Sequence, residues 1–198
     1  MEDDAIPTDA MMHSEERELE AERPRQPSRS DYVRDYLFLF SVSGLIVLLD
    51  QFSKSTVRAR LPLRESWAPF DFMEDYVRIV HWRNTGAAFG IFQNLGLVFT
   101  ILAIVVSIAI IYYFPRVPRE DWTFRLALAL QLGGAVGNLL DRIFAGEVTD
   151  FISVGSFPVF NIADASIFVG VLLLIYGMWQ KDRHLRVEKE SGQVQPGE

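Results

Sequence analysis

The chain has 198 residues, of which 49% are hydrophobic and 23% charged, and its formal net charge is −7. It contains no cysteine, which excludes a disulfide framework, a thiol nucleophile and a thiolate metal site. Its three histidines, at positions 13, 81 and 184, are too scattered along the chain to indicate a zinc site. The apolar residues gather in long blocks, which is typical of a membrane protein.

Residues 1–30 carry most of the net negative charge. They hold nine acidic and four basic residues, three prolines and almost no large apolar residue. A segment of this composition cannot bury enough apolar surface to fold, so we expect a disordered acidic extension. It also lacks the basic start and apolar core of a secretory signal peptide. The polar residues 184–198 are expected to form a tail, which leaves residues 31–183 as the membrane domain.

Four apolar segments predict four transmembrane helices. The block 95–114 has twenty residues without a charge, enough to cross a hydrocarbon core of about 30 Å at about 1.5 Å per residue. The segment 36–49 is also uncharged, and 124–140 and 162–180 each carry one ionisable residue near an end. A soluble protein with four buried helices is the less favoured alternative. The expected helices cover about 36–57, 95–114, 124–141 and 162–180.

The connections 58–94 and 142–161 are expected on one side of the membrane. Residues 76–82, Tyr-Val-Arg-Ile-Val-His-Trp, are rich in β-branched and aromatic side chains and predict a strand. Residues 148–154 predict a second short strand, and two prolines within 61–72 indicate turns. The expected fold class is an all-α membrane protein of four transmembrane helices with a small outer-face β-sheet and loop.

Basic residues near the helix ends set the predicted orientation. Eleven lysines and arginines fall on the side that holds both chain ends, against seven on the other side. Aromatic residues such as Tyr112 and Trp179 fall at the predicted inner ends, as an interfacial belt requires. We therefore expect a multi-pass protein with both termini in the cytoplasm and its two longer connections outside.

Two aspartates at the facing ends of the last two apolar segments are the strongest functional signal. Asp141 ends one segment and Asp164 begins the next, which places both near the outer membrane face. Carboxylates at membrane depth are costly and usually functional, and two held together suit acid–base chemistry. A capping box with Asn161 explains Asp164 in part. Asp141 has no such explanation, because the dipole at a helix C-terminus disfavours an anion.

Further polar residues fall at the same predicted face. Asp50 and Lys54 are four residues apart, so they form either a simple ion pair or a brace for a site. Asp150 is either a surface acid or a partner of Arg142. The leading hypothesis is therefore one outward-facing polar site. Its candidate members are Asp50, Lys54, Asn84, Asn138, Asp141, Arg142, Asp150, Asn161 and Asp164.

Five short segments stand in order along the chain: Asp50-Gln51-Phe52-Ser53-Lys54, Asn84-Thr85-Gly86-Ala87-Ala88-Phe89, Gly134 with Gly137-Asn138-Leu139-Leu140-Asp141-Arg142, Val148-Thr149-Asp150-Phe151, and Asn161-Ile162-Ala163-Asp164. In this order they resemble the signature segments of lipoprotein signal peptidase, or signal peptidase II. The resemblance spans about residues 36–180. One such segment is a weak signal, whereas five in order at one predicted face are highly specific. The chain departs from the family in the extension 1–30 and in the stretch 62–75.

The resemblance implies an aspartic endopeptidase of the bacterial inner membrane. Such an enzyme cleaves the signal peptide from prolipoproteins just before a cysteine that already carries diacylglycerol. Asp141 and Asp164 correspond to the catalytic dyad, with no cofactor and no metal. The expected partners are lipidated prolipoproteins and membrane lipids, without nucleic acid, and we expect a monomer. The expected substrate-binding or dyad-supporting residues are Asp50, Lys54, Asn84, Gly86, Gly134, Asn138, Arg142, Asp150, Asn161 and Ala163.

The chemistry of two carboxyls fits this activity. One ionised aspartate deprotonates a water, while the protonated one donates toward the scissile carbonyl and then the leaving nitrogen. The helix dipole predicts the anion on Asp164, at a helix start, and the proton on Asp141, at a helix end. The main alternative is a small membrane transporter or proton channel, because buried aspartates also mark proton relays. A structural membrane scaffold is a second alternative.

Overall fold

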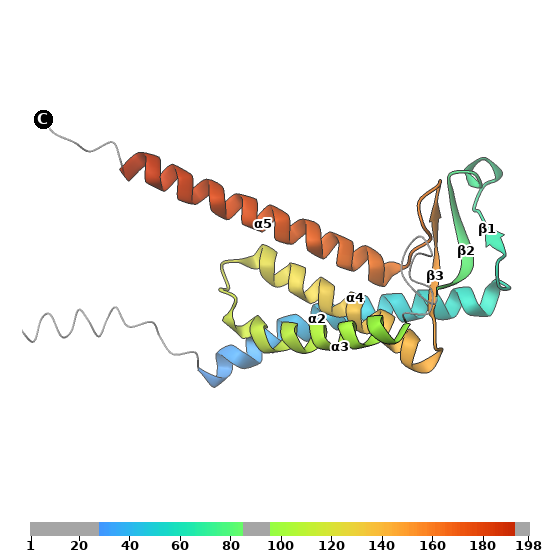
Figure 1. Cartoon of the computed structure of the whole chain (residues 1–198), viewed down its shortest axis with the longest axis horizontal. Helices are drawn as coiled ribbons and strands as arrows, with labels where there is room; N and C mark the ends of the chain where they lie inside the picture. The colour runs from blue at the N-terminus through green and yellow to red at the C-terminus, as the bar shows by residue number, and fades with distance from the viewer. Residues whose placement is uncertain (1–27, 85–95, 193–198) are drawn as a thin grey trace, which may run out of the picture. The chain divides into compact units, whose positions relative to one another are not determined.

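The computed structural model describes residues 28–84 and 96–192, with side chains described to residue 187. The predicted extension lies outside the described residues up to residue 27, as does Gly86. The chain divides into two units, 1–33 and 34–198, and the core and the site lie in the second. The elements are α2 (Arg29–Arg60), β1 (Ser66–Trp67), η1 (Asp71–Met73), β2 (Val77–Asn84), α3 (Gly96–Tyr113), η3 (Phe114–Arg116), α4 (Trp122–Phe144), β3 (Val148–Val154) and α5 (Ile162–Gly192) (Figure 1).

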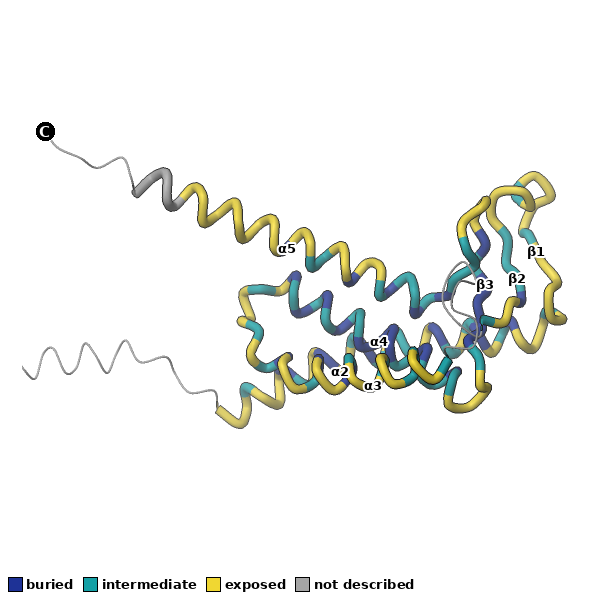
Figure 2. The backbone as a smooth tube through the Cα atoms, viewed as in Figure 1, coloured by how far each residue is buried: buried dark blue, intermediate teal, exposed yellow. Residues whose placement is uncertain are grey.

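Four of these helices are long and apolar enough to cross a membrane. In α2, α3 and α5 only 17–22% of the apolar window is buried within the protein, whereas in α4 the share is 56%. Many apolar residues of the three less buried helices are therefore exposed. Helix α4 has the largest buried share of the four (Figure 2). The predicted fold class, four membrane helices with a small sheet, is confirmed.

Two predicted helix boundaries are wrong. Helix α2 begins at Arg29 rather than near residue 36, because Ser28 and Asp31 cap it with reciprocal hydrogen bonds of 2.9 and 3.3 Å. Helix α5 continues to Gly192 rather than ending near residue 180. The polar residues beyond 180 support this continuation through pairs such as Asp182 with Arg186, 2.8 Å apart and four positions along the helix.

The three strands form one antiparallel sheet in the order β1-β2-β3, and both strands predicted from the sequence are confirmed. The register pairs Val77 with Val154 and Asn84 with Val148, with a shift between Ile79 and Trp82. This pairing brings the end of β2 beside the start of β3. The backbone of Phe160 then pairs with Ile152, which leads the chain from β3 to the start of α5.

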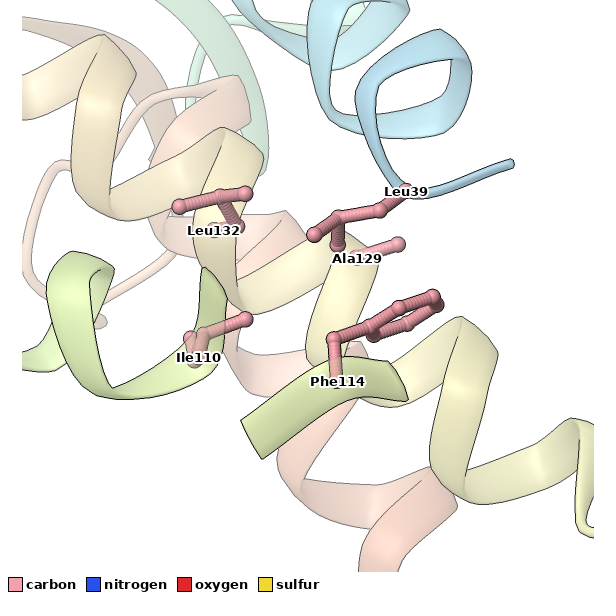
Figure 3. Packing of buried hydrophobic residues seen from close by; sticks show 5 residues of the cluster. All are labelled: Leu39, Ile110, Phe114, Ala129 and Leu132. Atoms are coloured by element: carbon pink, nitrogen blue, oxygen red, sulfur yellow. The ribbon is translucent and has the colours of Figure 1, made fainter. Parts of the chain in front are cut away.

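The apolar core lies between α2, α3 and α4. Its fully buried cluster joins Leu39, Ile110, Phe114, Ala129 and Leu132 (Figure 3). Small residues elsewhere on α4 let its neighbours approach closely, as in many membrane helix pairs.

Glycines on α4 permit close contact with two neighbouring helices. A Cβ on Gly133 would lie 2.7 Å from Cβ of Ile46 in α2. A Cβ on Gly134 would overlap the carbonyl oxygen of Ala163 in α5, and one on Gly137 would lie 2.8 Å from a carboxylate oxygen of Asp50. These glycines therefore hold α2, from Ser43 to Asp50, and the start of α5 against α4.

A buried ion cluster closes the other end of the helices. Asp35 of α2 accepts hydrogen bonds from Arg125 at 2.8 Å and from Arg119 at 3.0 Å. Arg125 also donates to the carbonyl oxygen of Val117 at 2.9 Å and lies 4.4 Å from the ring centroid of Phe114. The Arg125 and Asp35 side chains are 7% and 8% exposed, so this cation depends on its carboxylate partner.

Candidate active site

Polar side chains from five elements meet where the C-terminal halves of α2 and α4 approach β3, the end of β2 and the start of α5. Most of them are nearly or fully buried. Gly86 lies outside the described residues. The sequence-predicted residues that the structure brings together are Asp50, Lys54, Asn84, Gly134, Asn138, Asp141, Arg142, Asp150, Asn161, Ala163 and Asp164.

Asp141 accepts contacts from cationic and neutral donors at both of its carboxylate oxygens. Lys54 lies 3.2 Å from one carboxylate oxygen and Arg58 lies 3.4 Å from the other. The backbone N–H of Thr149 and the side-chain amide of Gln51 also donate to this carboxylate, at 3.0 and 3.2 Å. Two cations and two neutral donors thus occupy both oxygens of Asp141. The catalytic role expected of Asp141 stays a prediction.

Asp50 and Lys54 brace the site rather than form an isolated ion pair. Their charged atoms lie 2.7 Å apart, both side chains are fully buried, and Lys54 also donates to Asn138 at 3.0 Å. The second oxygen of Asp50 accepts the backbone N–H of Ala163 at 3.0 Å, in the first turn of α5. A carboxylate at this position satisfies one of the unpaired N–H groups of a helix start. Asp50 therefore ties α2 to α5.

Asn161 and Asp164 form the capping box that the sequence indicates. The backbone N–H of Asp164 donates to Oδ1 of Asn161 at 2.9 Å, and that of Asn161 donates to Oδ2 of Asp164 at 3.3 Å. The remaining oxygen of Asp164 accepts the Asn138 amide at 2.7 Å. Capping uses the side-chain oxygen of Asn161 and leaves its amide nitrogen available for another contact. Its Nδ2 donates to Oδ1 of Asp150 at 2.7 Å.

Asp150 is buried and has neutral hydrogen-bond donors. Its side chain accepts amide hydrogens from Asn161 and from Asn84 of β2, at 2.7 and 2.9 Å. Burial first, and then the charge of Asp164, raise the pKa of Asp150 to about 7, while these two hydrogen bonds and Lys54 oppose the rise. A carboxyl with this pKa exchanges a proton near neutral pH, as a general acid or base must.

Of the two alternatives considered for Asp150, the surface acid is wrong, whereas a partnership with Arg142 stays a prediction that a charge interaction between the two side chains supports. Asp150 is only 1% exposed, so it is not a surface acid. Arg142 donates its recorded hydrogen bond to the carbonyl oxygen of Asn138 at 3.3 Å, and its guanidinium lies 5.7 Å from the ring centroid of Phe99. Asp150 lies in a run of buried residues in β3, from Val148 to Phe151.

Sequence reasoning also missed three residues of the site. Gln51 donates to Asp50, Asp141 and the carbonyl oxygen of Gly137, and Arg58 and Thr149 contact Asp141. Gln51 sits inside the quoted Asp50–Lys54 segment, but amides in helices carry no distinctive pattern. Arg58 is one turn beyond Lys54 on α2, and this spacing was an available signal. Among the described residues, no group of three or more His, Cys, Asp or Glu is arranged to hold a metal ion.

Several known proteins are similar to this chain in sequence and in fold. The lipoprotein signal peptidase of Halalkalibacterium halodurans is 38% identical over 159 residues, which cover 78% of this chain and all of that protein. The lipoprotein signal peptidase of Anoxybacillus flavithermus is 35% identical over 154 residues, covering 76% of this chain and 90% of that protein.

Two solved structures, both described as bacterial membrane enzymes determined by the in meso method, are also similar. One, at 2.3 Å resolution, superposes with a TM-score of 0.64 at 29% identity and covers 81% of this chain and 93% of that one. The other, at 1.9 Å, has a TM-score of 0.63 at 32% identity, covering 71% and 91%. The family described as signal peptidase (SPase) II matches residues 42–180. By this match and these relatives, the chain belongs to the signal peptidase II family.

Proposed function

We propose that this chain is a membrane-embedded aspartic endopeptidase that removes signal peptides from bacterial prolipoproteins. The family match and the relatives named lipoprotein signal peptidase support this substrate class. Four helices able to cross a membrane support a multi-pass enzyme that meets its substrate within the bilayer. The transporter alternative has no such support.

The catalytic pair in this proposal is Asp150 with Asp164. The observation that carries it is the single side chain of Asn161, which donates to Asp150 at 2.7 Å while its oxygen caps the backbone of Asp164 at 2.9 Å. The charge of Asp164 contributes to raising the pKa of Asp150, so Asp164 lies close enough to favour the protonated form of Asp150. Asp141, the partner expected from the sequence, is instead surrounded by Lys54 and other donors.

The proposed reaction divides acid and base work between these two groups. Asp164, at a helix N-terminus, is the anion that takes a proton from a water as the water attacks the scissile carbonyl carbon. Asp150 holds the proton, donates it toward the carbonyl oxygen and receives it back as the tetrahedral intermediate collapses. The proton taken by Asp164 passes to the leaving nitrogen. This proposal keeps the negative charge on Asp164, as the sequence-based expectation does. It assigns the shared proton to Asp150 instead of Asp141.

The remaining site residues support this pair or bind substrate. Asn84 and Asn138 act through their hydrogen bonds to Asp150 and Asp164, and Asp50 with Lys54 fixes the start of α5. Arg142 is proposed to contact the substrate. The site faces the outer leaflet with both chain ends in the cytoplasm, as the distribution of basic residues favours. The lipid of the substrate then stays in the bilayer while its peptide backbone reaches the carboxyls.

Three matched substitutions test the assignment. Asp150→Asn and Asp164→Asn are each expected to abolish cleavage of a diacylglyceryl-modified precursor while leaving the protein folded in membranes. Asp141→Asn is expected to keep measurable cleavage per folded molecule but to lower stability, since it leaves Lys54 with less compensation in a buried site. An inactive, folded Asp141→Asn beside an active Asp150→Asn would restore Asp141 as the partner. Cleavage by all three variants would exclude an aspartic mechanism.

A further inference from the structure

We infer that Arg58 is a positioning residue for the proposed reaction: by joining Asp141 to the hydroxyl of Thr149, it fixes the strand segment that carries Asp150. The inference rests on the proposed role of Asp150. Arg58 lies on α2, outside the segments that resemble the family, and it does not touch Asp150 directly in the contacts that the structure gives it.

The contacts form a closed triangle of three residues. Nη1 of Arg58 donates to Oγ1 of Thr149 at 3.0 Å and lies 3.4 Å from Oδ1 of Asp141. The backbone N–H of Thr149 donates to Oδ2 of the same Asp141 carboxylate at 3.0 Å. Thr149 is thus held through both its side chain and its backbone, by residues from α2 and α4.

The strand transmits this restraint to the next residue. Successive side chains of a strand point to opposite faces, so fixing the position and rotation of Thr149 also fixes the face that Asp150 presents. Nδ2 of Asn161 lies 3.5 Å from the carbonyl oxygen of Thr149 and 2.7 Å from Oδ1 of Asp150. A displacement of Thr149 therefore alters the hydrogen bond that links Asp150 to the start of α5.

Arg58 is separable from the buried charges around it. Its side chain is 34% exposed, whereas those of Lys54 and Asp141 are 0% and 2% exposed. Without Arg58, Asp141 keeps Lys54, Gln51 and the Thr149 backbone as partners. The alternative role is that of a surface ion pair, which contributes little to stability and nothing to catalysis. The shorter contact, to the neutral hydroxyl, argues for positioning.

A double-substitution cycle in the full-length protein tests this inference. Arg58→Gln replaces the guanidinium with a shorter, uncharged amide, and Thr149→Val removes the hydroxyl while keeping a β-branched shape and the backbone N–H. The protein is reconstituted in phospholipid vesicles with a diacylglyceryl-modified precursor, and kcat, KM, the pH profile and the folded fraction are measured. Arg60→Gln is the matched control, because it removes a cation from the exposed end of the same helix.

Each single variant is expected to lower kcat about tenfold, with KM within twofold of the parent. The double variant is expected to have the same kcat as either single variant, because both substitutions remove the same Arg58–Thr149 hydrogen bond. The alkaline limb of the pH profile should move upward, since a weaker Asn161 hydrogen bond raises the pKa of Asp150. The charged groups that interact with Asp150 from neighbouring elements, Lys54, Arg142 and Asp164, are unchanged in these variants. Arg60→Gln should match the parent.

The outcomes separate this inference from the proposed function. If Asp150→Asn is inactive but Arg58→Gln keeps the parent kcat and pH profile per folded molecule, the positioning role alone is overturned. The same holds if Arg58→Gln only lowers thermal stability, or if the two substitutions act additively. If Asp150→Asn cleaves at the parent rate, the proposed pair and this inference fall together.

Discussion

The Asn161 side chain donates a hydrogen bond to Asp150 across 2.7 Å, from the residue that caps α5 to a residue inside β3. The same side chain therefore serves both helix initiation and the proposed pair. These two roles are separable by substitution, because a serine keeps a capping oxygen but has no amide to reach Asp150.

We predict that Asn161→Ser folds almost normally but cleaves at least tenfold more slowly, with an alkaline limb shifted upward. Asn161→Ala, which also loses the cap, should be destabilised further, by about 1 kcal/mol. Thermal unfolding and a pH–rate profile measure the two effects. An Asn161→Ser variant with the parent rate and profile would show that the contact with Asp150 has no catalytic role.

The raised pKa of Asp150 predicts how stability depends on pH. Its ordinary value of 3.8 rises to about 7 in the folded protein, because of burial and the charge of Asp164. Between about pH 4 and 7 the folded state therefore binds more protons than the unfolded state, and the free energy of unfolding falls as pH rises. Denaturant unfolding of the parent and of Asp150→Asn measures this contribution. An identical slope in both proteins would contradict it.

The pair should also limit activity above neutral pH. If Asp150 must be protonated to donate, the cleavage rate falls as pH rises past about 7, where that carboxyl ionises. A pH–rate profile under conditions where substrate is below KM reports this group in the free enzyme. A rate that stays constant to pH 9 would contradict a protonated Asp150.

Gly134 is predicted to be intolerant of a single methyl group. A Cβ there would overlap the Ala163 carbonyl oxygen and lie 2.6 Å from Oγ of Ser166, both in the first turns of α5. Gly134→Ala should therefore separate α5 from α4, destabilise the protein by about 1–3 kcal/mol and impair cleavage. Gly44→Ala is the control, because nothing lies within 4 Å of its added Cβ. Equal stability of the two variants would refute this close packing.

The ion cluster at the opposite end should affect stability without affecting the reaction. Asp35→Asn leaves the buried Arg125 without a carboxylate at 2.8 Å, and the expected loss is about 3–5 kcal/mol. Asp121→Asn breaks a more exposed pair with Lys181, for which about 0–1 kcal/mol is expected. Thermal unfolding compares the variants, and kcat per folded molecule should be unchanged in both. Similar stability losses in the two variants would mean that burial does not determine how much an ion pair contributes to stability.

The orientation is testable because the chain has no cysteine. We predict that a cysteine at the exposed Ser66 reacts with a membrane-impermeant maleimide on intact cells, because the proposed topology places β1 on the outer side. A cysteine at the exposed Glu120, between α3 and α4, should react only after the membrane is permeabilised. The reverse pattern would invert the proposed topology.

Much of the fold was predictable because the bilayer imposes simple requirements. An uncharged block such as 95–114 must be helical to satisfy its backbone in lipid, and the observed helix is Gly96–Tyr113. The β-branched and aromatic residues of 76–82 likewise predicted β2. The end of α5 was missed because polarity marks where a helix leaves the membrane and does not require the helix itself to end.

The site was predictable as a group of residues but not in its pairing. Position along the chain placed Asp141, Asp150 and Asp164 at one face. Which carboxylate pairs with cations depends on contacts between residues that are distant in the sequence. Lys54 and Arg58, which pair with Asp141, lie more than eighty positions before it. The helix-dipole argument compared Asp141 with Asp164 alone and omitted these cations. Asp150, in a short strand, had no local feature that indicated its burial.

The location of Asp164 on α5 has a consequence for the making of the protein. Synthesis runs from the N-terminus, so residues 161–164 follow α2, α3 and α4, and Asp150 emerges only shortly before them. A nascent chain with three inserted helices thus has the cations around Asp141 but lacks half of the proposed pair. Proteolytic capability would arise late in biogenesis, when α5 enters the bilayer beside α4, and incomplete chains would be inert toward neighbouring membrane proteins.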